Sequence, residues 1–180
     1  MSTTTYVTDA FTLGTGLLLA RLILGALMVG HGTQKLFGWF GGYGIAGTAG
    51  FFESLGFRPG RPFVLTAALS EVASGLLIVL GLFGPIGPAL LVSLMIVAAV
   101  TVHWKGGIFA TTNGIEVPLL YATGAVALAF TGFGPFSLDA VLAIDHAWTP
   151  AIKAAALAIG VVGGVVNLLA RRQAAVTATA

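Results

Sequence analysis

Cysteine is absent from this sequence, and charged residues make up only 8% of its 180 residues. Without cysteine the chain has no disulfide, no thiolate nucleophile and no cysteine-ligated metal. Soluble domains carry about 25% charged residues, so six acidic and eight basic side chains are too few to cover a soluble core. The net charge of +2 is too small to indicate nucleic-acid binding. These shortages exclude a soluble enzyme, a disordered chain and a coiled coil.

Apolar residues are abundant instead, at 57% before the 26 glycines are counted. A helix needs about 20 apolar residues to cross the hydrocarbon core of a bilayer. Residues 72–102 are uncharged and too long for one span, and the Gly-Pro-Ile-Gly-Pro sequence at 84–88 divides them. The expected spans are residues 13–37, 62–83, 86–104, 117–133 and 154–170. We therefore predict an all-α polytopic transmembrane helix bundle, with a four-helix core in residues 13–138 and a fifth C-terminal span.

The other segments are a polar N-terminal tail (1–12), an interfacial segment (38–60), a loop that precedes the fifth span within 139–172, and a C-terminal tail (173–180). Phenylalanines beside Glu53 and Arg58 predict a short amphipathic helix in the interfacial segment. The alternative to five spans is four spans and a last helix that lies on the membrane surface.

Charged residues in the loops indicate an orientation. With five spans, one side of the membrane collects the basic residues Arg58, Arg61, Lys105, Arg171 and Arg172. The other side collects Asp9, Asp139, Asp145 and Lys153. The positive-inside rule then predicts a multi-pass protein of the plasma membrane, the inner membrane of the cell, with the N-terminus outside and the C-terminus in the cytoplasm.

Ionisable side chains inside spans are costly and mark candidate sites. In the first span Arg21, His31 and Lys35 lie within about 80° of one another on a helical wheel, and Met28 falls in the same arc. Glu71, in the second span, is expected at the depth of residues 28–31. A carboxylate there is protonated or needs a cation within reach, and Arg21, His31 and Lys35 are the available partners.

Further polar residues are expected at the cytoplasmic ends of the spans. The expected catalytic residues are Glu71, His31, Lys35 and Glu116, and the expected substrate-binding residues are Arg21, Gln34, His103, Asn113 and Met28. Simpler interpretations stay open. Lys35 can extend to the interface, Glu116 can interact with a helix dipole, His103 can be an interface residue, and Arg21 can be purely structural. His31 and His103 differ too much in depth for a shared haem, and we expect neither haem nor a metal.

Several of these residues fall in a recognisable pattern. Arg21 precedes the run GHGTQKLFGWFGG at 30–42, and Glu71 and the segments 47–56, 113–120 and 132–139 follow in order. Together they resemble the DoxX family over about residues 15–140. The resemblance implies a four-helix membrane core with a redox-associated role, whose hallmarks are the arginine, the His/Gln/Lys cluster and two glutamates. The family includes the membrane subunit of thiosulfate:quinone oxidoreductase. The fifth span departs from the four-helix form.

The leading hypothesis is a membrane subunit of a redox system that binds a quinone head group in the cytoplasmic half of the bundle. His31 would donate a hydrogen bond to a quinone carbonyl, Lys35 or Arg21 would stabilise negative charge, and Glu71 would carry a proton. Glu116 and His103 would connect this site to cytoplasmic water. The alternatives are a non-catalytic anchor that recruits a soluble redox enzyme, and a small transporter of an anion or lipid-like metabolite.

The last span carries small residues, Ala156, Gly160 and Gly164, at intervals of four. Such a face lets another helix approach closely. That helix can belong to this chain, to a protein partner or to a second copy of the chain. Besides the lipid bilayer, we therefore expect a protein partner or a homo-oligomer formed through the last span.

Overall fold

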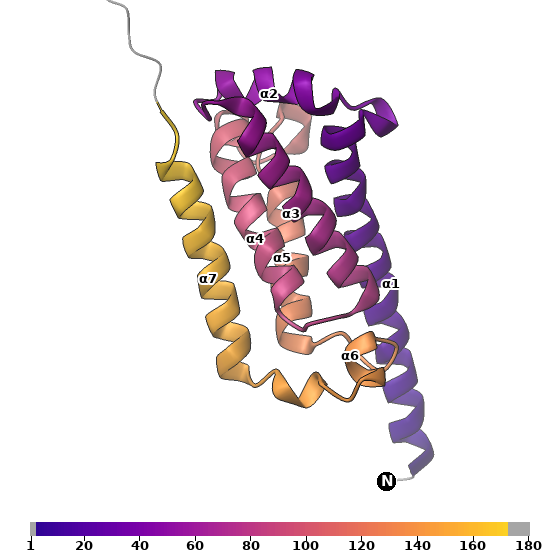
Figure 1. Cartoon of the computed structure of the whole chain (residues 1–180). Coiled ribbons are helices and arrows are strands. Elements are labelled where there is room, and N and C mark those ends of the chain that lie inside the picture. The colour runs from indigo at the N-terminus through magenta and orange to yellow at the C-terminus, as the bar shows by residue number, and fades with distance from the viewer. Residues whose placement is uncertain (1–2, 173–180) are drawn as a thin grey trace, which may run out of the picture.

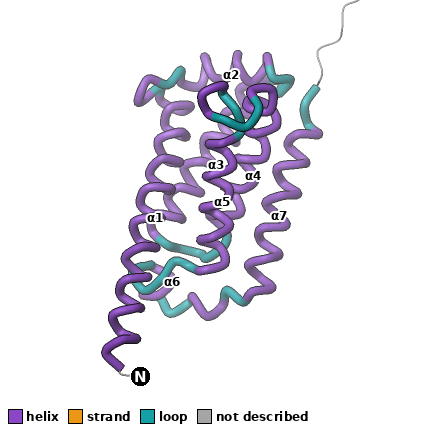
Figure 2. Tube along the Cα trace, turned by 180° about the vertical axis from the view of Figure 1, so that it is seen from behind, coloured by secondary structure: helices purple, strands orange, loops and turns teal. Residues whose placement is uncertain are grey.

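The computed structural model describes residues 3–172, and the side chains from residue 9 onward. This part of the chain contains helices and no strand, which confirms the all-α prediction. The five long helices are α1 (Thr3–Phe37), α3 (Gly60–Leu80), α4 (Ile86–Ala98), α5 (Glu116–Thr131) and α7 (Pro150–Leu169). They stand side by side in one bundle (Figure 1). Figure 2 gives the view from behind, in which α5 stands between α1 and α7.

Short helices close the two ends of this bundle. The helix α2 (Gly44–Ser54) lies across one end, and α6 (Leu138–Val141) lies at the other (Figure 1). We refer to these as the α2 end and the α6 end. Beyond Ala98, α4 continues as a π-helical turn (Ala99–His103) and a 3-10 turn (Trp104–Gly106). Further 3-10 turns cover Trp39–Gly41, Ala110–Thr112 and Asp145–Ala147.

Four helical segments of the described chain are long and apolar enough to cross a membrane. They are Asp9–Phe37, Gly60–Leu80, Ile86–Gly106 and Pro150–Leu169. The remaining expected span corresponds to α5, an apolar helix of 16 residues. Helix α7 stands alongside α4 rather than across an end of the bundle (Figure 1). The chain is therefore a multi-pass membrane protein, and its apolar helices fit a lipid bilayer.

The observed helix limits differ from the expected ones at several places, and α7 for example begins at Pro150 rather than at residue 154. Residues 3–12, expected as a polar tail, form the first part of α1. Helix α3 ends at Leu80 because Gly81 adopts a left-handed conformation (φ 64°) and caps the helix. The regular part of α4 ends at Ala98 because the π-helical turn follows. The expected C-terminal tail, residues 173–180, lies outside the described residues.

Glycines bring α1 and α3 into backbone contact. A Cβ atom at Gly25 would lie 2.6 Å from the Gly75 carbonyl oxygen, and one at Gly75 would lie 2.5 Å from the Gly25 carbonyl oxygen. Two turns further, a Cβ at Gly32 would lie 2.7 Å from the Ala68 carbonyl oxygen. Small residues allow such close packing between membrane helices. These pairs fix the antiparallel register of α1 against α3, which sets which polar side chains can meet.

The small-residue face of α7 packs inside this chain. A Cβ at Gly160 would collide with the Ala89 carbonyl oxygen of α4, and one at Gly164 would lie 3.0 Å from the Ser93 carbonyl oxygen. The sequence did not decide whether the helix on this face belongs to this chain, to a partner or to a second copy. The structure shows that α4 of the same chain packs there. The other side of α7 is exposed, with 71% of Ile159 and 60% of Val162 accessible, and fits contact with lipid.

Candidate functional site

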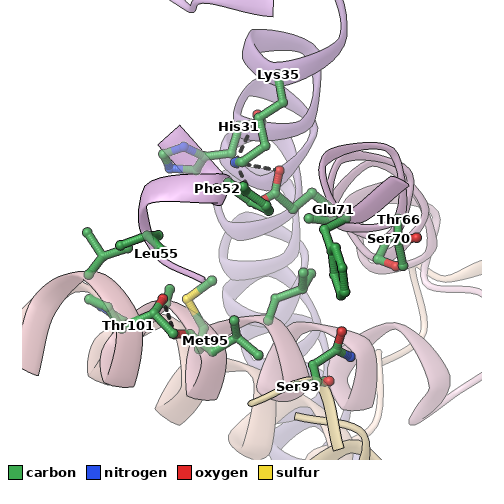
Figure 3. Close-up of a pocket in the computed structure, with 18 of the residues that line it drawn as sticks. His31, Lys35, Phe52, Leu55, Thr66, Ser70, Glu71, Ser93, Met95 and Thr101 are labelled. Atoms are coloured by element: carbon green, nitrogen blue, oxygen red, sulfur yellow. Dashed lines mark hydrogen bonds and ion pairs between the residues drawn. The ribbon is translucent and has the colours of Figure 1, made fainter. Parts of the chain in front are cut away.

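A cavity of about 300 Å³ lies inside the bundle, beneath α2. Its walls come from α1, α3, α4, α5 and one residue of α7. Phe51 and Phe52 of α2 close it, together with Leu55, which directly follows α2 (Figure 3). Most of the lining is apolar, including Met28 and Met95. The polar lining residues are His31, Lys35, Thr66, Ser70, Glu71, Ser93, Thr101, His103, Tyr121 and Asn167. An apolar cavity with a few polar groups is the usual form of a small-molecule site.

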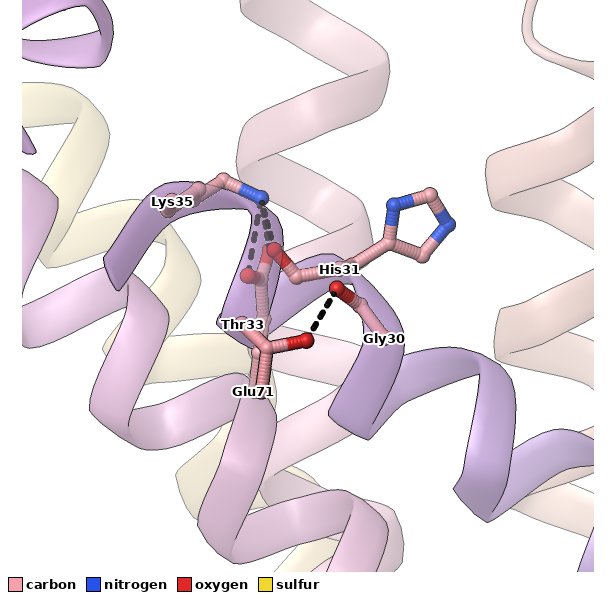
Figure 4. Close-up of polar contacts among 5 residues, drawn as sticks. All are labelled: Gly30, His31, Thr33, Lys35 and Glu71. Carbon is pink, nitrogen blue, oxygen red and sulfur yellow. Dashed lines mark hydrogen bonds and ion pairs between the residues drawn. The ribbon is translucent and has the colours of Figure 1, made fainter. Parts of the chain in front are cut away.

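The strongest polar contact on this wall is an ion pair between α1 and α3. The Lys35 Nζ atom lies 2.7 Å from Glu71 Oε1 and 2.8 Å from Glu71 Oε2. Figure 4 shows the lysine above the carboxylate, where it also donates to the His31 carbonyl oxygen at 3.4 Å. Lys35 therefore extends back into the bundle instead of out to the interface. Glu71 is 7% exposed, so this charge is compensated inside the protein.

His31 lines the cavity but is not part of the ion pair. Its ring points away from Glu71 (Figure 4) and stands edge-on to the ring of Tyr121, with 6.1 Å between the centroids. Its main chain accepts the bond from Lys35. The imidazole is thus available to a molecule in the cavity, on the α5 side of the wall.

The π-helical turn places Thr101 and His103 on the cavity wall. The His103 Nδ1 atom lies 3.1 Å from the Asn113 carbonyl oxygen. A carbonyl can only accept, so this ring nitrogen carries the hydrogen. Single π turns occur often at functional sites. His103 therefore connects the cavity to the loop that precedes α5.

Three other expected site residues support loops around the cavity and do not line it. Gln34 donates to the Phe40 carbonyl oxygen at 3.2 Å, which ties α1 to the turn that follows it. Glu116 accepts from the Ala110 amide at 2.7 Å. Asn113 contributes its carbonyl oxygen to His103 and adopts a left-handed backbone conformation (φ 60°). All three lie at the α2 end, as the sequence predicts.

Arg21 lies away from the cavity, and its expected place beside Glu71 is wrong. Arg21 is 1% exposed, and its guanidinium donates to four carbonyl oxygens. These belong to Ile78 (3.0 Å), Val79 (2.7 Å), Phe133 (2.9 Å) and Phe136 (3.0 Å). Ile78 lies seven residues after Glu71, about 10 Å along α3. Arg21 therefore joins the end of α3 to the segment after α5.

Arg21 was expected beside Glu71 because a helical wheel gives the direction in which a side chain points but not its depth along the helix axis. Arg21 and Lys35 share a face of α1, but fourteen residues separate them, about 21 Å along the axis. The shared face meets α3 at both levels. At the α2 end it meets a carboxylate, and at the α6 end it meets carbonyl oxygens in the last turn of a helix.

A second buried polar network lies at the α6 end, and the sequence interpretation missed it. The Asp139 carboxylate accepts hydrogen bonds from the amides of Phe83 (2.8 Å) and Gly84 (2.7 Å) and from Trp148 Nε1 (2.9 Å). Asp139 is 2% exposed, although its position suggested a loop residue. Its contacts hold the turn between α3 and α4. The cavity residues Ser93, Thr101 and Asn167 were also missed, and their polarity within apolar runs was the available signal.

Residues 9–172 contain no group of three or more His, Asp and Glu side chains that could hold a metal ion. The DoxX family model matches residues 16–104, which contain Arg21, the Lys35–Glu71 pair and most of the cavity wall. The match ends before α5 and α7. No curated protein and no solved structure matches the chain.

Proposed function

The chain belongs to the DoxX family, and we propose that it binds a quinone head group beside the Lys35–Glu71 pair, as the membrane subunit of a redox system. Family membership indicates a redox-associated membrane protein. The observation that carries the finer proposal is a buried ion pair on the wall of a largely apolar cavity. A quinone, when bound, accepts two electrons and two protons. It therefore needs an apolar site with a hydrogen-bond donor and a proton carrier.

The cavity residues fit such a molecule. A volume of about 300 Å³ is enough for a small ring system. Met28 and Phe52 provide apolar walls, and the His31 ring and the Lys35 ammonium provide donors for carbonyl oxygens. The bundle carries no second buried carboxylate on this wall among the described residues. Glu71 is therefore the proposed proton carrier.

We assign the roles by position. Lys35 holds a positive charge beside the place where negative charge would develop, and Glu71 exchanges a proton with the bound molecule. His31 orients the ring from the α5 side. His103 would relay protons from the α2 end, where Glu116 and Asn113 shape the loop next to it. Arg21 has no part in this proposal because its donors are committed to carbonyl oxygens elsewhere.

A pair of thiols could donate electrons to a bound quinone, but the described chain has no cysteine. The electrons would therefore come from a protein partner or a small reductant. Arg58, Arg61, Lys105, Arg171 and Arg172 flank the α2 end. By the positive-inside rule we place this end in the cytoplasm, with the protein in the plasma membrane. Proton uptake would then come from the cytoplasm.

The test is to purify the full-length protein with its native lipids and to measure bound quinone per protein by extraction and mass spectrometry. Three proteins are compared: the wild type, Glu71→Gln, and Asp145→Asn as a carboxylate control at the α6 end. We expect quinone in the wild type and the control, with quinone-linked turnover lost in Glu71→Gln. A wild type without quinone, or unchanged turnover in Glu71→Gln, contradicts the proposal. A stoichiometric soluble partner without quinone would support an anchor, and solute flux in vesicles would support a transporter.

A further inference from the structure

A second hollow, of about 430 Å³, lies at the α2 end between the last turn of α7 and the segment that follows α2. Three arginines line it, Arg58, Arg171 and Arg172, together with Leu168 and Leu169. We propose that this hollow binds the phosphate of an anionic phospholipid, whose acyl chain lies along the outer face of α7. Leu55 is the one residue that lines both this hollow and the cavity beneath α2. The proposal does not depend on the proposed function.

Contacts with main-chain oxygens hold the Arg171 side chain and the Arg172 backbone in place. Arg171 Nε donates to the Leu55 carbonyl oxygen at 2.9 Å, and its guanidinium lies 5.8 Å from the centre of the Phe57 ring. The Arg172 amide donates to the Gly56 carbonyl oxygen at 2.8 Å. Together these bonds attach the end of α7 to the turn after α2. The hollow is therefore built by contacts between distant parts of the chain.

The donors that suit a phosphate remain available. Arg58 uses its Nε atom toward the Glu53 carbonyl oxygen at 3.4 Å, and Arg171 uses its Nε atom toward Leu55. Within residues 9–172, no acceptor pairs with the terminal Nη atoms of the three arginines. A guanidinium presents these atoms as a fork that matches two phosphate oxygens.

The one acidic side chain in the hollow does not neutralise it. Glu53 Oε1 accepts the Gly60 amide at 2.8 Å, so this carboxylate caps the first turn of α3. Three guanidinium groups and one carboxylate leave the lining positively charged. An anion is therefore the favoured occupant.

The apolar part of the lining favours a lipid over a free anion. Leu168 and Leu169 end α7, a helix apolar enough to cross the membrane, and Leu169 is 78% exposed. Below it, Val166 and Val162 continue the exposed face of α7 at helical spacing. The arginines thus stand where the apolar surface stops, which is the level of phospholipid headgroups. Basic pockets at this level are typical sites for anionic headgroups.

The test measures lipid retention by native mass spectrometry of the full-length protein in neutral detergent, with phosphatidylglycerol or phosphatidylcholine added. The variant is Arg58→Gln/Arg172→Gln, which leaves the anchoring Arg171 in place. The control is Arg61→Gln/Lys105→Gln, which removes the same charge at the same end outside the hollow. We expect the variant to retain phosphatidylglycerol at least about tenfold less than wild type, because charge-assisted hydrogen bonds are lost. The control should match the wild type.

Three results would overturn the proposal. They are equal retention of both lipids by the wild type, an equal loss in the control, and displacement of the lipid by inorganic phosphate at the concentration of the lipid. The last would assign the hollow to a soluble anion. A thermal unfolding curve of each variant confirms that it is folded before its lipid is measured.

Discussion

The Lys35–Glu71 pair allows a direct test of how the bundle tolerates charge. Replacing Glu71 by Gln, or Lys35 by Met, removes one partner of a contact at 2.7 Å. In soluble proteins, loss of one partner of a buried pair costs about 3–5 kcal/mol, whereas interhelical hydrogen bonds in membranes average about 0.6 kcal/mol. The Lys35 side chain is 22% exposed and that of Glu71 9%, so the pair lies between these limits. We expect each single substitution to cost about 2 kcal/mol.

The assay is a double-mutant cycle on reversible unfolding in detergent. Lys35→Met, Glu71→Gln and the double variant are compared with the wild type at one pH. In the double variant no charge is left without a partner, so it should cost about 1.5 kcal/mol less than the sum of the two single variants. Additive costs would refute the coupling that the geometry implies. Single costs no larger than those of surface substitutions, about 0.5 kcal/mol, would refute the burial argument as well.

The same variants separate stability from function. By the same reasoning the double variant should be about as stable as either single variant, because the coupling offsets most of the second loss, but it carries neither the proton carrier nor the positive charge. It should therefore fold and still fail to retain quinone. A double variant that binds quinone as the wild type does would remove both residues from the proposed site.

Three further predictions concern the contacts that build the bundle. Gly25→Ala forces a methyl group against the Gly75 carbonyl oxygen and should cost about 1–3 kcal/mol in thermal unfolding, whereas Gly30→Ala has no atom within 4 Å of the new methyl and should be neutral or stabilising. Arg21→Met leaves four carbonyl oxygens without their donor and should cost at least about 3 kcal/mol, while quinone bound per folded molecule stays unchanged. Asp139→Asn weakens the acceptor of the Trp148 indole N–H. In a chain whose other two tryptophans are replaced by Phe, the fluorescence emission of Trp148 should therefore shift. An unshifted spectrum would contradict the contact.

Much of the fold follows from composition and periodicity, because a membrane helix must be long and apolar. The Gly-Pro-rich turn at 84–88 divided a long apolar run correctly, and the depth assigned to Glu71 agrees with the α1–α3 register. Lys35 was a predicted partner and is the observed one. These features depend on spacing along one helix, or on the fact that successive spans cross the membrane in opposite directions. Both can be worked out from the sequence.

Other features depend on packing that a sequence does not record. The four carbonyl oxygens around Arg21 come from segments more than fifty residues away in the chain, and main-chain acceptors have no residue signature. The π-helical turn that brings His103 to the cavity contains no proline or glycine from which it could be predicted. The aromatic residues of α2 predicted an interfacial helix, but their position over a cavity depends on the turn before α2.

Helix α5 has a consequence for the surrounding bilayer. Its 16 residues span about 24 Å, whereas the 21 residues of Ile86–Gly106 beside it span about 31 Å. Leu120 and Phe130 are exposed on α5, so lipid tails meet the short helix directly. Tails of ordinary length must shorten or tilt there, at a cost of fractions of a kcal/mol for each ångström of mismatch. We therefore expect the leaflets to be thinner on this flank, with short-chain lipids concentrated along it.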